Sequence, residues 1–265
     1  MKDKKIAIIG CGNLGLTIAH GLIDDGFEVG NLIATRRNTS SLAELASKGV
    51  TVTSDNSEAV KMADVVVLAV KPYNVEPILK EISSSLESGK HILVCLATGI
   101  TLADLATWSG TELPIFRAMP NTAADVNESM TLICDKGASL KQREAMKQLF
   151  DKIGTTLYID ESLMEAATIL GACGIAYVLR FMRAMIQGGI EVGFDAKTAT
   201  AIVSQTMKGA SELIIQNGSH PESEIDKVTT PKGCTITGLN EMEHAGFSSA
   251  LIKGIVASYK KIEKQ

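Results

Sequence analysis

The chain has 265 residues and a formal net charge of −4, with 45% apolar and 21% charged residues. This length accommodates one large domain or two ordinary ones, and the apolar content is sufficient for a sizeable core. The acidic balance and the aromatic content of 4% argue against a nucleic-acid or anionic-membrane partner. The first apolar run, residues 6–9, is too short for a signal peptide or a membrane span, so we expect a cytoplasmic protein.

The cysteines and histidines indicate neither a disulfide framework nor a metal site. The five cysteines are odd in number, widely spaced and never arranged as Cys-x-x-Cys. The four histidines are scattered without the spacing of metal ligands. We therefore expect reduced thiols and no metal.

Short apolar runs alternate with helix-period segments over the first 160 residues. Apolar runs without polar alternation are typical of a parallel sheet covered on both faces. The alternation therefore predicts a doubly wound α/β domain. Helices are expected at 13–25 and 42–48 and after the capping boxes Thr101-x-x-Asp104 and Ser139-x-x-Gln142. Strands are expected at residues 6–9, 31–34, 50–53, 64–70, 91–96, 114–119, 130–134 and 155–159.

After about residue 160 the strand signals stop. Helix-period segments follow at 177–192, 196–215 and 248–262, and Ser162-x-x-Glu165 resembles a further capping box. We therefore divide the chain into an α/β Rossmann dinucleotide-binding domain, residues 1–160, and an all-α helical domain, residues 161–265.

The motif Gly10-x-Gly12-x-x-Gly15 follows an expected strand and opens an expected helix, which is the context of a dinucleotide site. Gly10 permits the tight turn, Gly12 leaves room for the pyrophosphate, and Gly15 lets helix and strand pack closely. The helix N-terminus offers N–H groups and a partial positive charge to the phosphates. The predicted contacts here are Gly10, Gly12, Asn13, Leu14 and Gly15.

The end of the second strand indicates which nucleotide binds. An NAD site usually has Asp or Glu there, and this chain has Thr35-Arg36-Arg37 instead. Guanidinium groups bind phosphate through paired hydrogen bonds, so this sequence favours NADPH, with NADH left open. The alternative is a pair of solvated arginines on a loop.

Two further strand ends belong to the expected ligand-binding edge of the sheet, Ala69-Val70-Lys71-Pro72 and Leu96-Ala97-Thr98-Gly99. Lys71 could neutralise a cofactor phosphate or cap a strand end, and both interpretations stay open. Of these two loops we predict cofactor contacts from Ala69, Val70, Lys71 and Ala97. The predicted set is completed by Asn56, Met119, Pro120 and Asn121.

Four motifs in order resemble the pyrroline-5-carboxylate reductase family over nearly the whole chain. They are Gly10-x-Gly12-Asn13-x-Gly15, Val70-Lys71-Pro72, Arg117-x-Met119-Pro120-Asn121-Thr122 and Val228-Thr229-Thr230-Pro231-x-Gly233-x-Thr235-Ile236-x-Gly238-Leu239. The resemblance implies a Rossmann domain followed by a helical dimerisation and substrate domain, and dimers that often assemble into rings of five. It also implies hydride transfer from NAD(P)H to the C=N carbon of 1-pyrroline-5-carboxylate, giving L-proline.

The substrate implied by the family is a cyclic imine that carries a carboxylate. The loop from Thr230 to Thr235 opens onto a helix, so its backbone N–H groups can bind an anion. The family motif assigns the imine nitrogen to Thr235, whose hydroxyl could also serve as a helix N-cap. We therefore predict Thr235 as the catalytic residue and a substrate site made by Thr230, Gly233, Cys234 and Thr235.

Two departures from the family concern the substrate site. Lys232 and Cys234 stand where the family usually has glycine and threonine, and a lysine lacks the backbone freedom of glycine. The segment 171–177 reads Gly-Ala-Cys-Gly-Ile-Ala-Tyr where the family usually reads Ser-Gly-Ser-Gly-Pro-Ala-Tyr. We interpret Cys173 as a small apolar filler, because no histidine partner is evident beside it. These changes leave a related imine open as substrate.

Two other functions are alternatives to imine reduction. A β-hydroxyacid dehydrogenase needs a lysine on the first long helix of its second domain, and this helix carries only Arg180 and Arg183, which are poor proton shuttles. A non-catalytic NADPH-binding protein would fit the altered segment. Glu165 could face the substrate pocket, although its place in the capping box is the simpler interpretation.

Overall fold

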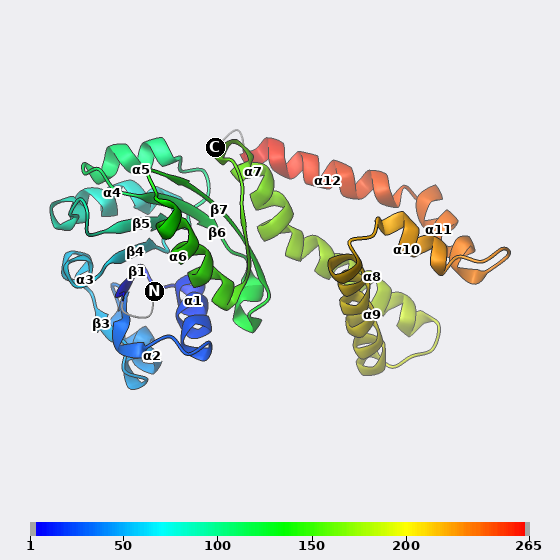
Figure 1. Cartoon of the computed structure of the whole chain (residues 1–265). Helices are drawn as coiled ribbons and strands as arrows, with labels where there is room; N and C mark the ends of the chain where they lie inside the picture. The colour runs from blue at the N-terminus through cyan, green and yellow to red at the C-terminus, as the bar shows by residue number, and fades with distance from the viewer. Residues whose placement is uncertain (1–3, 263–265) are drawn as a thin grey trace. The chain divides into compact units, whose positions relative to one another are not determined.

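The computed structural model describes residues 4–262 (Figure 1). The described chain divides into two compact units, one made by residues 4–173 together with 261–262, the other by residues 174–260. The first unit contains all the strands found in the described chain, and the second is entirely helical.

The first unit is built on one eight-stranded sheet whose order is β3-β2-β1-β4-β5-β6-β7-β8. The strands from β3 to β6 pair in parallel, β7 is antiparallel to β6, and β8 is parallel to β7. Every predicted strand is found within two residues of its expected bounds. The strands of the described residues are β1 (Ile6–Ile9), β2 (Leu32–Thr35), β3 (Thr51–Thr53), β4 (Val65–Leu68), β5 (Ile92–Cys95), β6 (Ile115–Met119), β7 (Ser129–Lys136) and β8 (Gly154–Tyr158).

Helices cover both faces of this sheet, as the sequence predicts. One buried apolar cluster joins the sheet to α1 (Asn13–Asp24), α2 (Ala43–Ser47) and α6 (Leu140–Phe150). A second cluster on the other face joins it to α3 (Asn56–Met62), α4 (Pro72–Ile82), α5 (Leu102–Ser109) and the short α7 (Met164–Ala167). Because each face has its own buried cluster, this unit has a complete core.

Short 3₁₀ turns and one π-helix connect these elements. The 3₁₀ turns are η1 (Val29–Asn31), η2 (Thr39–Leu42), η3 (Ser83–Ser85), η4 (Thr122–Val126), η5 (Asp151–Ile153) and η6 (Glu161–Leu163). The π-helix is η7 (Thr168–Cys173), which ends the first unit. Single π turns of this kind occur frequently at functional sites.

Two of the three predicted capping boxes form. Thr101 with Asp104 and Ser139 with Gln142 make both reciprocal hydrogen bonds at the starts of α5 and α6. The prediction for Ser162-x-x-Glu165 is wrong, because α7 begins after Leu163 without a side-chain cap. The physical reason is a stronger partner, since the Glu165 carboxylate binds the guanidinium of Arg117.

The second unit consists of long helices with little buried apolar surface. Among its side chains only Ala199 and Val203 are buried, whereas Leu179 is 57% and Ile252 60% exposed. The helices are α8 (Gly174–Glu191), α9 (Ala196–Asn217), α10 (Pro221–Lys227), α11 (Cys234–His244) and α12 (Phe247–Ile262). The three long helices match the predicted segments, α11 is the helix expected after the loop 230–235, and α10 was not predicted as a separate element.

One helical run, residues 161–191, is long and apolar enough to cross a membrane when judged by length and composition alone. Only 17% of its most apolar window is buried. A helix that packs against another subunit presents the same kind of uncovered apolar surface.

Candidate active site

The glycine-rich loop after β1 has the geometry that the motif predicts. Gly10 has a φ of 77°, and a Cβ atom added to it would lie 2.1 Å from Cγ1 of Val70. A Cβ on Gly15 would lie 3.2 Å from Ile8 and 3.3 Å from Ala69. Gly10 therefore permits both the turn and the approach of the β4 loop, and Gly15 permits close packing of α1 on the strands.

The start of α1 is open to an anion. Gly12 is the N-cap residue of α1 and has no side chain to cap the helix. A Cβ added there would meet nothing nearer than the Gly10 carbonyl at 3.8 Å, so the space above the loop is unfilled by the described chain. The first-turn N–H groups, including those of Asn13 and Leu14, therefore point at a space that a phosphate can occupy.

Two predicted contacts, Thr35 and Asn56, hold this loop in place. The Thr35 hydroxyl accepts a hydrogen bond from the Gly10 N–H at 3.1 Å and donates one to Oδ1 of Asn56 at 2.7 Å. The Asn56 amide in turn donates to Glu81 at 3.2 Å. Thr35 is buried. Both polar groups are thus engaged within the protein, and their role in this structure is to fix the loop against β2.

The two arginines after β2 are available for a phosphate. Arg36 is half-buried and Arg37 exposed, and neither guanidinium has a hydrogen-bond or ion-pair partner among the described residues. Burial raises the pKa of Cys11 to about 12, and the charge of Arg36 opposes that rise. Arg36 therefore contributes positive potential at the glycine-rich loop, where an anionic cofactor would bind.

The loops after β4 and β5 lie at the same edge of the sheet, because β1, β4 and β5 are parallel and adjacent. Ala69 and Val70 contact the glycine positions described above, and Ala97 is buried. Lys71 is exposed and precedes α4 as its N-cap residue, but its side chain makes no capping hydrogen bond. The ammonium group is therefore available to a cofactor phosphate.

The segment after β6 is buried and fully hydrogen-bonded. Met119, Pro120 and Asn121 are all buried. The Asn121 amide donates to the Gly171 carbonyl at 3.1 Å, and its oxygen accepts from the Ala123 N–H at 3.0 Å. Asn121 thus ties the carboxyl end of β6 to the π-helix η7, and this contact was not predicted from the sequence.

The predicted substrate residues form a tight turn and a helix start in the second unit. The Gly233 N–H donates to the Thr230 carbonyl at 2.9 Å, which closes the turn Thr230-Pro231-Lys232-Gly233. Lys232 has a φ of 63°, in the left-handed region that glycine adopts more readily. A Cβ on Gly233 would lie 2.6 Å from the Thr230 hydroxyl, so only glycine fits there.

Thr235 is the second residue of α11 and is half-buried. The alternative that its hydroxyl serves as the N-cap is wrong, because Gly233 is the N-cap residue and no side chain caps this helix. Cys234, the first residue of α11, is exposed. The hydroxyl of Thr235 makes no hydrogen bond within the described chain, so it is free to bind a ligand.

Arg117 is a functional candidate that the sequence analysis did not include among the site residues. It lies on β6 and is the only Arg, Lys, Asp or Glu classed as buried among the described residues. Its guanidinium binds Glu161 at 3.2 Å and Glu165 at 2.7 Å. Burial alone would lower the pKa of Arg117, and the two carboxylates hold it above its ordinary value. An arginine within an otherwise apolar strand was the signal that could have identified it.

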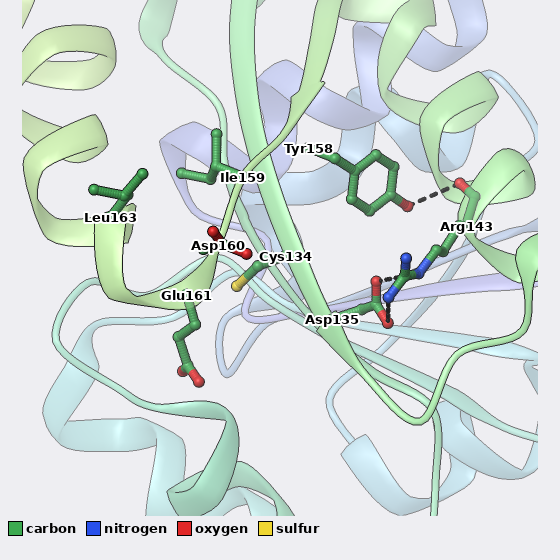
Figure 2. Close-up of a pocket in the computed structure, with 8 residues that line it drawn as sticks. All are labelled: Cys134, Asp135, Arg143, Tyr158, Ile159, Asp160, Glu161 and Leu163. Carbon is green, nitrogen blue, oxygen red and sulfur yellow. Dashed lines mark hydrogen bonds and ion pairs between the residues drawn. The ribbon is translucent and has the colours of Figure 1, made fainter.

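A pocket of about 480 Å³ lies beside this network, on β7, β8 and the segment that follows (Figure 2). Arg143 and Asp135 form a paired contact there, with atoms 2.7 and 3.1 Å apart, and the Tyr158 hydroxyl donates to the Arg143 carbonyl at 2.8 Å (Figure 2). Arg143 is therefore engaged by both Asp135 and Tyr158 in the wall of this pocket. Its lining is Cys134, Asp135, Arg143, Tyr158, Ile159, Asp160, Glu161 and Leu163.

The described residues contain no group of three or more His, Cys, Asp or Glu side chains that could hold a metal ion. His91 is buried, its Nδ1 accepts from the Glu87 N–H, and its Nε2 lies 3.0 Å from the Val60 carbonyl. Cys173 is half-buried and Cys95 and Cys134 are buried, with burial raising the pKa of each of these two thiols to about 11. Cys95 and Cys134 are therefore protonated near neutral pH and poor nucleophiles.

Comparisons with known proteins decide the family. One family model, described as pyrroline-5-carboxylate reductase dimerisation, matches residues 161–265, and another, described as NADP oxidoreductase, coenzyme F420-dependent, matches residues 5–98. Pyrroline-5-carboxylate reductase 2 of Dictyostelium discoideum is 39% identical over 279 residues, which cover 99% of this chain and 93% of the relative. The chain belongs to the pyrroline-5-carboxylate reductase family. Pyrroline-5-carboxylate reductase 1 of the same organism is 42% identical, and the match spans 49% of that relative's length.

Solved structures of the pyrroline-5-carboxylate reductase family have the same fold. The enzyme of Coxiella burnetii superposes with a TM-score of 0.91 at 28% identity, covering 98% of both chains. The Plasmodium falciparum protein, solved with NADP bound, gives 0.88 at 26% identity over all of this chain and 98% of that one. A 3-hydroxyisobutyrate dehydrogenase of Mycobacterium tuberculosis is similar in fold alone, with a TM-score of 0.53 at 14% identity. The predicted family and fold class are confirmed.

Proposed function

We propose that this chain reduces 1-pyrroline-5-carboxylate to L-proline with NADPH. The observation that carries the proposal is the glycine-rich loop followed by two unpaired arginines, in a chain that also presents a free Thr235 hydroxyl at the start of α11. The relative of known structure from Plasmodium falciparum was solved with NADP bound, which supports the same cofactor here.

The residues of the first unit fit a phosphorylated dinucleotide. Gly12 leaves an open space at the N-terminus of α1, and the first-turn N–H groups would bind the pyrophosphate there. Arg36 and Arg37 would bind the 2′-phosphate, and Lys71 would add a further positive charge. The bound nicotinamide supplies a hydride, which adds to the imine carbon.

The residues of the second unit would bind and orient the imine. The turn 230–233 and the first N–H groups of α11 would bind the substrate carboxylate, and the Thr235 hydroxyl would hydrogen-bond to the imine nitrogen. When hydride adds to the carbon of the protonated C=N bond, the electron pair of that bond moves to nitrogen, giving the neutral secondary amine. Thr235 orients the nitrogen and is not required as the acid.

The deciding experiment follows the loss of NADPH absorbance with purified protein and 1-pyrroline-5-carboxylate, repeated with NADH. Turnover that is faster with NADPH is the expected result. Thr235→Ala should lower kcat/KM by about 10- to 100-fold, the value of one oriented hydrogen bond to the reacting group. An unchanged rate in the variant would remove Thr235 from the mechanism.

The segment at 171–175 favours a second candidate, a related cyclic imine as substrate, because it lacks the serines and proline usual in the family. NADPH binding without turnover of 1-pyrroline-5-carboxylate would point to this candidate or to a non-catalytic role. A panel of five- and six-membered cyclic imino acids separates the two.

For the assembly we propose a cytoplasmic homodimer whose helical part, residues 161–265, makes the interface, and a decamer of five such dimers. The matched dimerisation family and the uncovered apolar side chains of the second unit support a homo-oligomer. Sedimentation velocity distinguishes monomer, dimer and decamer by mass.

A further inference from the structure

A buried ion-pair network anchors the segment that ends the first unit. Arg117 on β6 binds Glu161 and Glu165, which lie 44 and 48 residues later in the chain. Glu161 also accepts a hydrogen bond from the Leu102 N–H at 2.6 Å. The start of this segment is thereby fixed to two elements of the sheet domain, β6 and α5.

The far end of the same segment has its own anchor. Asn121, four residues after Arg117, donates from its side-chain amide to the Gly171 carbonyl at 3.1 Å. A Cβ on Gly171 would lie 3.2 Å from Cδ1 of Leu132, so the π-helix η7 packs tightly on β7. Residues 161–173 are therefore held at both ends by β6, with η7 at the carboxyl end of this strand. Ligands bind at this edge in open α/β sheets.

The ion-pair network of Arg117 does not satisfy all of its own buried polar atoms. The Nε of Arg117 and the Oε2 of Glu165 are buried without a hydrogen-bond partner in the described chain. Burying an arginine and a carboxylate with unsatisfied atoms costs stability, and a purely apolar contact would anchor the segment without that cost. Cys95 and Cys134, which flank Arg117 on the neighbouring strands, offer it no compensating charge near neutral pH.

We propose that Arg117 is a positioning residue for the reaction, acting through Glu165 to fix η7 at the cofactor edge of the sheet. The proposal rests on the proposed function in one respect, that the imine is reduced at the cofactor edge of the sheet, where η7 lies. Fixing η7 then sets the position of the imine relative to the nicotinamide and contributes little to NADPH affinity. A displacement of about 1 Å at a reacting centre can lower the rate 100-fold.

The test uses the full-length protein with Arg117→Lys, which keeps the charge and loses the planar fork. We expect kcat/KM for 1-pyrroline-5-carboxylate to fall by about 10- to 100-fold, with the Kd for NADPH, measured by its fluorescence, changed less than about twofold. Arg143→Lys is the matched control, because Arg143 also pairs with a carboxylate of the sheet domain but forms no hydrogen bond or ion pair with η7 among the described residues. An equal loss in both variants would overturn the proposal.

A triple variant separates positioning from stability. Arg117→Met with Glu165→Met and Glu161→Gln replaces the buried pair by apolar side chains and removes the charge of the third member, which is expected to preserve or raise the melting temperature. The proposal requires that kcat/KM stays low in this stable protein. Recovery of kcat/KM together with the melting temperature would show that the pair is only a structural contact.

Hydrogen exchange tests the anchor without any turnover, so the failure of the proposed function can be told from the failure of this inference. In Arg117→Lys, the amides of residues 168–173 should exchange at least about tenfold faster, while those of η4 stay unchanged. Unchanged exchange at 168–173 would overturn the positioning role. If the wild-type protein is inactive but Arg117→Lys shows this exchange pattern, the anchoring of η7 by Arg117 is supported and only the proposed reaction is rejected.

Discussion

The two units of this protein differ in how much of their apolar surface they bury. The first unit closes a core on both faces of its sheet, with side chains such as Ile8 and Leu79 fully buried. The second unit has hardly any buried side chain and leaves large apolar residues such as Leu179 and Ile252 exposed. The first unit therefore buries its apolar core within one chain, whereas the exposed apolar side chains of the second unit require a further surface to cover them.

The largest effect is expected from a charge placed on the uncovered surface of the second unit. Ile252→Asp on α12 should dissociate the homo-oligomer, because burying an unpaired carboxylate in an interface costs about 3–5 kcal/mol. Sedimentation velocity should show a monomer that still binds NADPH. The neighbouring exposed position gives the control, and Lys253→Ala should leave the mass unchanged. An oligomer that survives Ile252→Asp would exclude this part of α12 from the interface.

A smaller loss of stability is expected from adding a side chain at Gly10, where the first unit has no space for one. In Gly10→Ala, the added methyl group would lie 2.1 Å from Val70 in a backbone with positive φ, and we expect about 3 kcal/mol of destabilisation. Gly12→Ala is the matched variant, because its methyl group meets no atom within 3.4 Å. It should melt like the wild type and still lose NADPH affinity. If Gly12→Ala binds NADPH normally, the open space above the loop is not the phosphate site.

Substitution of the two arginines after β2 tests whether the first unit prefers NADPH over NADH. Replacing both Arg36 and Arg37 by Ala removes the charge-assisted contacts to a 2′-phosphate, which together are worth about 1.5–3 kcal/mol at this solvent-accessible position. The Kd for NADPH should rise by about 10- to 100-fold, and the Kd for NADH should change little. Fluorescence titration with both cofactors measures this. Equal losses of affinity for NADPH and NADH would mean that the arginines have a role other than binding the 2′-phosphate.

The smallest effect concerns the strained turn of the second unit. Lys232→Gly should raise the free energy of unfolding by about 1 kcal/mol, because glycine adopts the φ of 63° without the penalty of a side chain. Lys232→Ala removes the charge and keeps the strain, so it should show no such gain. Thermal unfolding of the two variants in parallel separates backbone strain from charge. A gain in both variants would mean that charge, not strain, limits stability here.

The sequence predicted most accurately what depends on neighbours along the chain. The strands lie within two residues of their expected bounds, since continuous apolar runs are a local signal. The glycine motif, the boxes at Thr101 and Ser139 and the absence of strands after residue 160 are equally local. The family also followed from the sequence, because its motifs are short and occur in order.

The tertiary structure decided which polar groups are free and which are engaged. Thr35 and Asn56, whose contacts to the cofactor stay a prediction, also hold the glycine-rich loop, because the strands and helices that carry them are adjacent in space. Glu165 was expected in a capping box, but Arg117 reaches it from a strand 48 residues earlier. Such partners depend on sheet order and on what a helix packs against. The local sequence determines the elements and their turns, whereas long-range packing in a low-dielectric interior selects the partners of each charge.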